Sequence, residues 1–137
     1  MEYILQNALP ILLATAAGLL IGLGFRRATA SAGRLRLGPE APLSLGDLVV
    51  IALAQAWLAA ILAGALILAP SEAGAWTMAV GSAVVIWVGF VVPATVVNHV
   101  HRGLPKLAPV VDAAYWLIVM LVQAVVLKSI GLTAPTG

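Results

Sequence analysis

Four long runs of apolar residues, separated by short polar segments, dominate the chain. They cover about residues 4–25, 47–69, 75–97 and 109–131. Because a helix rises about 1.5 Å per residue, roughly 20 residues cross the ~30 Å hydrocarbon core of a bilayer, so each run is long enough to span. The pattern predicts an all-α integral membrane protein, a four-helix transmembrane bundle that forms one domain over residues 1–137.

Residues at the ends of the runs agree with this division. The first run stops at Arg26, and Ser44 or Asp47 can cap the second. Pro109 suits the first turn of the fourth helix. Since the connections are short, we expect consecutive helices to be antiparallel neighbours.

Basic residues are concentrated in two of the connections. Six of the seven Lys and Arg residues lie in segments 26–46 and 98–108, and only Lys128 lies elsewhere. Because cytoplasmic loops of membrane proteins carry an excess of Lys and Arg, both segments are predicted to be cytoplasmic. Both chain termini are then on the non-cytoplasmic side.

Composition narrows the chemistry that the chain can perform. The chain is 63% hydrophobic and 9% charged, has a net charge of +2 and contains no cysteine. It can form no disulfide or thiolate metal site, and it has no basic patch that could bind nucleic acid. Membrane lipid is the predicted surrounding, and no cofactor is expected.

Small residues recur at helical spacing within the runs. The predicted helix-packing positions are Gly18, Gly22, Ala60, Gly64, Gly81 and Gly89. Lipid offers no hydrophobic drive for helix association, so close approach at small residues has to supply it. These seams fit packing within one chain, between copies of a homo-oligomer or against another membrane protein. A permeation surface is the alternative.

Polar residues are few within the runs. By residue count, Thr15 and Gln55 lie at similar depths. Ser82 and Gln123 do so as well, and we expect that each pair can form a hydrogen bond. Such bonds contribute about 0.6 to 2 kcal/mol each, which favours packing specificity over a transport path.

The richest polar constellation lies where the third and fourth runs meet the second basic loop. Helical spacing places a candidate polar or ion site on one face of each helix, formed by Thr95, Asn98, Asp112, Tyr115 and Gln123. Pro93 removes a backbone hydrogen bond from the third helix, so we expect a kink there.

Asp112 lies about one turn inside the predicted membrane boundary, where a carboxylate needs a partner. The candidate partners are Asn98, Arg102 and Lys106. One interpretation is a carboxylate that binds a proton or a cation, and the other is a structural latch between the loop and the fourth helix. His99 and His101 diverge on a helix, so no metal site is predicted.

A tryptophan-containing run, Trp-Val-Gly-Phe, begins at Trp87, and a second motif, Val-Asp-Ala-Ala-Tyr-Trp-Leu, begins at Val111. With Asn98, Gly103 and Lys106 between them, residues 81–131 resemble the small bacterial membrane proteins of domain-of-unknown-function family 1761. The amino-terminal half is similar only in hydropathy and in its glycine-rich first helix, and an arginine-glycine-proline loop replaces the aromatic stretch common in that family. The resemblance implies a four-helix, multi-pass protein of the bacterial cell inner membrane and no known activity.

Three function classes remain. The preferred one is a structural or accessory membrane protein that acts through helix packing, as a homo-oligomer or with a membrane-protein partner. The alternative is a small transporter or channel that uses the intramembrane carboxylate of Asp112 with Asn98, Tyr115 and Gln123. An enzyme is not expected, because the sequence offers no nucleophile–base pair and no carboxylate pair.

Overall fold

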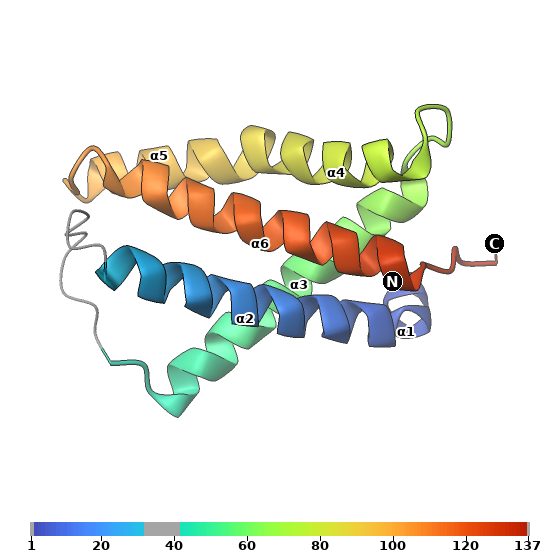
Figure 1. Cartoon of the computed structure of the whole chain (residues 1–137), viewed down its shortest axis with the longest axis horizontal. Coiled ribbons are helices and arrows are strands. Elements are labelled where there is room, and N and C mark those ends of the chain that lie inside the picture. Colours follow the sequence, from blue (N-terminus) through green and yellow to red (C-terminus); the bar gives the residue numbers. More distant parts are fainter. Residues whose placement is uncertain (1, 32–41, 137) are drawn as a thin grey trace.

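The computed structural model describes residues 2–31 and 42–136. Its helices are α1 (Glu2–Gln6), α2 (Ala8–Ser31), α3 (Leu45–Leu68), α4 (Ala75–Ile86), the π-helical η1 (Trp87–Val91), α5 (Val92–His101) and α6 (Ala108–Ile130) (Figure 1). No strand occurs among these described residues. Because α4, η1 and α5 follow one another without a break, four helical stretches are long and apolar enough to cross a membrane. The predicted all-α fold with four candidate transmembrane helices is confirmed.

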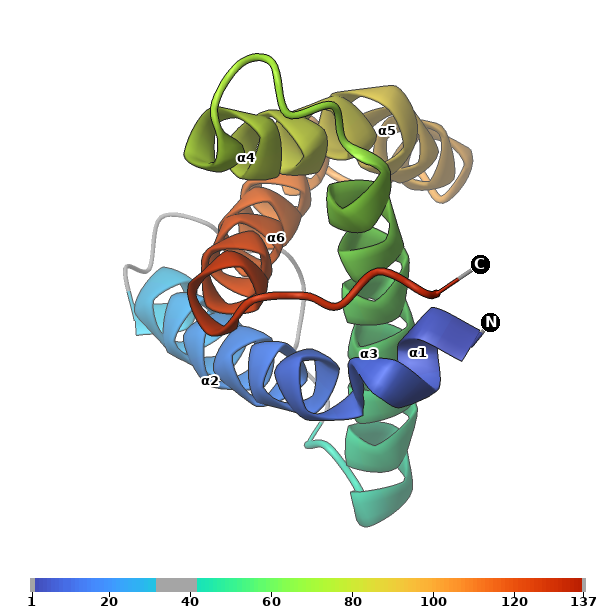
Figure 2. The ribbon, with the colours of Figure 1, turned by 90° about the vertical axis from the view of Figure 1, so that its right-hand side faces the viewer.

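α6 lies at the centre of the bundle. α2 packs along one side of α6 and the continuous α4–α5 helix packs along the other, while α3 crosses them at a steep angle (Figure 1, Figure 2). Both termini and the turn from α3 to α4 lie at one end of the molecule, which we call the terminal end. The end of α2 and the turn from α5 to α6 lie at the other, which we call the basic end. It carries Arg26, Arg27, Arg102 and Lys106.

Two helices run further than the sequence predicts. α2 continues to Ser31 and α5 continues to His101, so the predicted basic loops 26–46 and 98–108 are partly helical. A charged residue ends the part of a helix that lies in lipid, but arginine is a good helix former and its long side chain can reach the headgroup layer. The remainder of the first predicted loop, residues 32–41, lies outside the described residues.

A break near the amino terminus separates α1 from α2. Pro10 has no N–H to donate to the carbonyl of Gln6, and its ring crowds that carbonyl. Asn7 fills the break and is buried. Its amide nitrogen donates to the carbonyls of Tyr3 and Thr133, at 2.8 Å each, and its oxygen accepts from the Thr133 N–H at 2.7 Å. The segments near the two ends of the chain are thereby fastened to each other.

The start of α3 carries a capping box. The Ser44 hydroxyl accepts from the Asp47 N–H at 3.2 Å, and the Asp47 carboxylate accepts from the Ser44 N–H at 2.8 Å. Two backbone N–H groups that the helix start would leave without partners are thus satisfied. Ser44 is the N-cap and Asp47 completes the box, so both predicted capping residues act together.

The disruption expected at Pro93 is a π-helical turn. The N–H of Val92 donates to the carbonyl of Trp87, five residues back. In an α-helix it would donate to the carbonyl four residues back. The indole N–H of Trp87 donates to the backbone carbonyl of Ala113 at 2.7 Å. One turn of the third span is therefore widened, and the indole ties that turn to α6.

Apolar side chains fill the terminal half of the bundle. The buried members of this core come from α2, α3, α4 and α6: Ile11, Ala14, Ala59, Ala60, Leu62, Ala63, Ala83, Met120, Ala124 and Leu127. Toward the basic end, the oblique course of α3 carries its first turns away from α6 (Figure 1). A cavity lies on that side, between α2, α3 and α6.

Candidate functional site

Three polar side chains meet at the basic end, where α2, α5 and α6 come together. Nε2 of His99 lies 2.8 Å from Oδ2 of Asp112, and the guanidinium of Arg26 lies 4.0 Å from Oδ1. The His99 side chain is 12% exposed and the Asp112 side chain 29% exposed. The carboxylate is therefore held from two sides at a partly buried position.

The geometry of His99 requires a proton between its ring and Asp112. Nδ1 lies 2.7 Å from the backbone carbonyl oxygen of Thr95, and because a carbonyl only accepts, Nδ1 carries a hydrogen. Nε2 lies 2.8 Å from a carboxylate oxygen, and at that distance one of the two atoms must also carry a hydrogen. Whichever atom owns that proton, the His99–Asp112 pair as a whole is uncharged.

A second polar cluster lies deeper in the bundle, among α2, α3 and α6. The Gln55 amide nitrogen donates to the Tyr115 hydroxyl at 3.0 Å, and the Gln123 amide nitrogen donates to the backbone carbonyl of Gln55 at 3.3 Å. Both glutamines are buried, and neither side-chain oxygen has a hydrogen-bond partner among the described residues. A buried polar atom without a partner costs roughly 1–3 kcal/mol, so a cluster that retains two is a candidate functional site.

Two glycines of α2 make room for this cluster. A Cβ at Gly18 would lie 2.7 Å from Oε1 of Gln55 and 2.9 Å from Nε2 of Gln123. A Cβ at Gly22 would lie 2.8 Å from the Tyr115 hydroxyl oxygen. These distances are shorter than van der Waals contact, so α2 can approach the polar cluster this closely only because both positions lack a side chain.

Tyr115 joins the two clusters. Its ring lies 4.9 Å below the guanidinium carbon of Arg26, in cation–π geometry. Phe25 and Trp116 meet the same ring edge-on, with centroid separations of 6.1 Å and 5.1 Å. Aromatic contacts thus hold the Tyr115 ring in place, with its hydroxyl directed at Gln55 and its face covered by Arg26.

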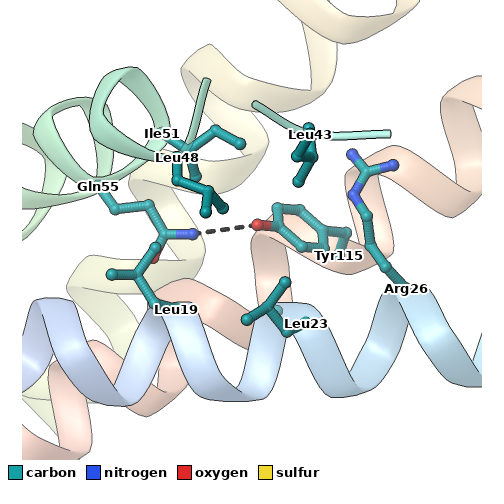
Figure 3. A pocket seen from close by; sticks show the side chains of 9 residues that line it. Leu19, Leu23, Arg26, Leu43, Leu48, Ile51, Gln55 and Tyr115 are labelled. Atoms are coloured by element: carbon teal, nitrogen blue, oxygen red, sulfur yellow. Dashed lines mark hydrogen bonds between the residues drawn. The ribbon is translucent and has the colours of Figure 1, made fainter. Parts of the chain in front are cut away.

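A cavity of about 370 Å³ opens beside Tyr115 (Figure 3). Four leucines and Ile51, from α2, from α3 and from the segment before α3, form most of its wall. Gln55 and Tyr115 bound it on the side of the polar cluster, and Arg26 lies beside it toward the basic end (Figure 3). Apolar walls with a few converging polar groups are the usual form of a small-ligand site.

The partners predicted for Asp112 are wrong. The carboxylate contacts His99 and Arg26 instead of the three candidates Asn98, Arg102 and Lys106. The turn of α5 that meets α6 presents His99, which leaves Asn98 exposed, and Thr95 contributes its backbone carbonyl to the His99 ring. Asp112 therefore links α6 to two neighbouring helices at once.

The predicted pairing of polar residues by depth is also wrong. The Thr15 hydroxyl donates to the Ile11 carbonyl of its own helix at 2.7 Å, and Gln55 instead meets Tyr115. Gln123 donates to the backbone carbonyl of Gln55, whereas Ser82 was its predicted partner. Matching residues by depth assumes upright helices, and α3 is strongly tilted (Figure 2).

Sequence reasoning did not include Arg26, Gln55 or His99 in the candidate site. Two of them had a usable signal, since Arg26 follows Gly22 by one helical turn and His99 follows Thr95 by one turn. Each therefore shares a helix face with a residue that was singled out. Gln55 had no such signal, because its contact with Tyr115 depends on how α3 crosses α6.

The predicted packing positions differ in what surrounds them. Ala60 is buried, and a Cβ at Gly64 would lie 2.9 Å from the Tyr3 hydroxyl oxygen. Gly18 and Gly22 contact the polar cluster, as described. By contrast, a Cβ at Gly81 or Gly89 would meet no described atom within 4 Å. The two glycines of the third span thus serve no close approach within the described part of the chain.

No family model, curated protein or solved structure matches the chain. The resemblance of residues 81–131 to family 1761 stays a prediction. By its fold, the protein belongs to the class of helical proteins with four apolar helices fit to cross a membrane.

Proposed function

We propose that the chain is a multi-pass protein of a bacterial inner membrane, with its basic end in the cytoplasm. The basic residues at that end are Arg26, Arg27, Arg102 and Lys106, while Lys128 lies toward the terminal end. The excess of Lys and Arg in cytoplasmic segments supports this orientation, which puts both termini outside. The resemblance to family 1761 supports the bacterial setting.

Within that membrane we propose a structural or accessory role, in which the chain acts through helix packing as a homo-oligomer. The observation that carries this proposal is the exposure of the third span. Only 6% of the apolar window in Ala75–His101 is buried within the chain, whereas the other three spans bury 28% to 44%. The third span packs mainly on α6 and leaves its opposite side uncovered.

The uncovered side of α4 is suited to close helix contact. Ala79 and Ala83 are buried against the bundle, and Gly81, Val85 and Val88 lie on the opposite face at 100° per residue. A Cβ at Gly81 would meet no described atom beyond its own helix turn within 4 Å, which leaves room there for a second backbone. Small residues on a lipid-facing surface allow a second helix to approach closely, so we expect another copy of the chain to pack on this face.

Cysteine cross-linking tests this face cleanly, because the chain has no cysteine of its own. We expect Gly81→Cys to form a disulfide-linked dimer in native membranes under mild oxidation, since a two-fold contact brings equivalent positions together. Leu12→Cys, on an exposed part of α2, is the matched control and should stay monomeric. A non-reducing gel measures both variants. Equal cross-linking at the two positions, or none at position 81, would contradict self-association through α4.

A transporter or channel is the second candidate. The observation that favours it is the close contact between His99 and Asp112, at 2.8 Å, with Asp112 within 4.0 Å of an arginine that lines the cavity. The apolar core fills the terminal half of the bundle, so transport would require a second conformation that opens that half. No enzymatic activity is proposed, because the site residues in the described part of the chain include no nucleophile beside a base.

Proton flux into proteoliposomes, followed with an enclosed pH-sensitive dye, tests this second candidate. If Asp112 carries the proton, Asp112→Asn should abolish the flux, because the amide does not titrate. Circular dichroism and size-exclusion chromatography show whether the variant remains folded. Flux that persists in a folded Asp112→Asn variant, or no flux in the parent protein, would eliminate this candidate.

A further inference from the structure

The cavity beside Tyr115 has the size and walls for one apolar chain. Its volume of about 370 Å³ holds about a dozen methylene-sized groups at roughly 30 Å³ each. Leucine and isoleucine side chains form its long walls, and Arg26 is the only charged side chain among the described residues that line it. A single acyl chain fits this space, whereas the second tail of a phospholipid would have to remain in the bilayer.

The polar groups around the cavity can donate hydrogen bonds to an occupant. The Tyr115 hydroxyl already accepts from Gln55, so its own hydrogen is available to an acceptor in the cavity. The Arg26 guanidinium has five N–H groups in a planar fork, and it can contact Asp112 and a second oxyanion at the same time. These groups match a head that carries acceptor oxygens, such as a carboxylate or a phosphate.

Charge at the basic end favours an anionic head. Asp112, within 4.0 Å of Arg26, shares a proton with His99, so this pair adds no net negative charge. An anionic head is therefore attracted here, and a cationic head on a chain of the same length is repelled.

The cavity is accessible from the side of the bundle. Leu43 and Leu48, which form its wall near the start of α3, are 53% and 42% exposed. In Figure 3, Leu43 lies on the side of Arg26, and Leu48 lies nearer Gln55. A chain entering from the surrounding bilayer would keep its head near Arg26 and the Tyr115 hydroxyl and lay its tail along the leucine and isoleucine walls.

We propose that this cavity binds one apolar chain of an amphiphile whose head is an anionic carboxylate or phosphate. The proposal does not depend on self-association through α4. Tetradecanoate is the probe, added to the protein in phosphatidylcholine nanodiscs and measured by the shift in thermal unfolding temperature. We expect tetradecanoate to raise that temperature in a saturable way, and tetradecyltrimethylammonium to leave it unchanged.

Variants identify the groups that hold the head. Arg26→Gln should weaken tetradecanoate binding about tenfold or more, because a hydrogen bond to a charged group contributes about 1.5–3 kcal/mol. Arg27→Gln is the matched control, since that side chain does not line the cavity, and it should bind as the parent does. Leu48→Trp fills the space without changing the donors and should abolish binding while the fold is kept.

The same assay separates the two sources of the head. If replacing phosphatidylcholine by phosphatidylglycerol blocks tetradecanoate, the natural head is a lipid phosphate, and if it does not, a free fatty acid is the ligand. Either outcome supports an anionic amphiphile. Equal binding of the ammonium compound, equal loss in the Arg26 and Arg27 variants, or parent-like binding by Leu48→Trp would overturn the proposal. Failure of the parent protein to bind tetradecanoate in phosphatidylcholine would overturn the proposal as well.

Discussion

Gly18→Leu is expected to unfold the bundle. The first side-chain carbon alone would lie 2.7 Å from Oε1 of Gln55 and 2.9 Å from Nε2 of Gln123, and three more carbons would follow it. Neither amide can swing aside without loss, because both side chains are buried and both donate hydrogen bonds. We expect the free energy of unfolding to fall by about 3 kcal/mol or more, a large part of the ~5–15 kcal/mol that holds a typical domain together.

Gly24→Leu is the matched control for this substitution. Gly24 lies in the same helix, but a Cβ there would meet no described atom within 4 Å. It should leave the unfolding free energy unchanged or raise it slightly, because leucine is the better helix former. Titration with sodium dodecyl sulfate in mixed micelles, followed by circular dichroism, compares the two variants. Equal stability of the Gly18 and Gly24 variants would show that α2 and α6 do not approach each other as described.

His99→Phe should lower the free energy of unfolding by about 1.5–3 kcal/mol. The substitution keeps a ring of similar size but removes the hydrogen bond between Nε2 and the Asp112 carboxylate, which is then left partly buried without its closest partner. His101→Phe is the control, because His101 is exposed, and its effect should stay within about 0.5 kcal/mol. The same detergent titration measures both.

A double variant shows whether the His99–Asp112 contact itself stabilises the fold. Combining His99→Phe with Asp112→Leu removes both partners, and replacing both ends of a hydrogen bond by apolar groups can be nearly neutral. We therefore expect the double variant to recover most of the stability that His99→Phe loses. If the double variant instead loses the sum of the stability lost in the two single variants, His99→Phe and Asp112→Leu, the two side chains stabilise the fold independently of each other.

The hydropathy pattern was sufficient to predict the four long apolar helices. Twenty apolar residues in a row have few alternatives to a transmembrane helix, because every backbone group in lipid has to bond within its own segment. Sequence signals at a helix start also agree with the structure, as Ser44 and Asp47 show at the start of α3. The exact ends were missed at Ser31 and His101, where the helices continue beyond the apolar run.

The contacts between helices could not be predicted in the same way. Which residue of α3 reaches Tyr115 depends on the crossing angle of two helices, and that angle leaves no periodicity in either sequence. Gln55 was therefore paired with Thr15, and Asp112 with the basic loop, although both side chains bond elsewhere. The closeness of Gly18 to the two glutamines is a consequence of the same crossing, although the glycine itself was predicted to be a packing position.

The most direct test of the proposed role is the mass of the intact protein released from its own membrane in a native lipid disc and measured by native mass spectrometry. We predict a homo-oligomer of defined copy number, which Gly81→Phe converts to the monomer because the larger side chain blocks the uncovered face of α4. A parent chain recovered as a monomer, or an oligomer that Gly81→Phe leaves intact, would contradict self-association through that face.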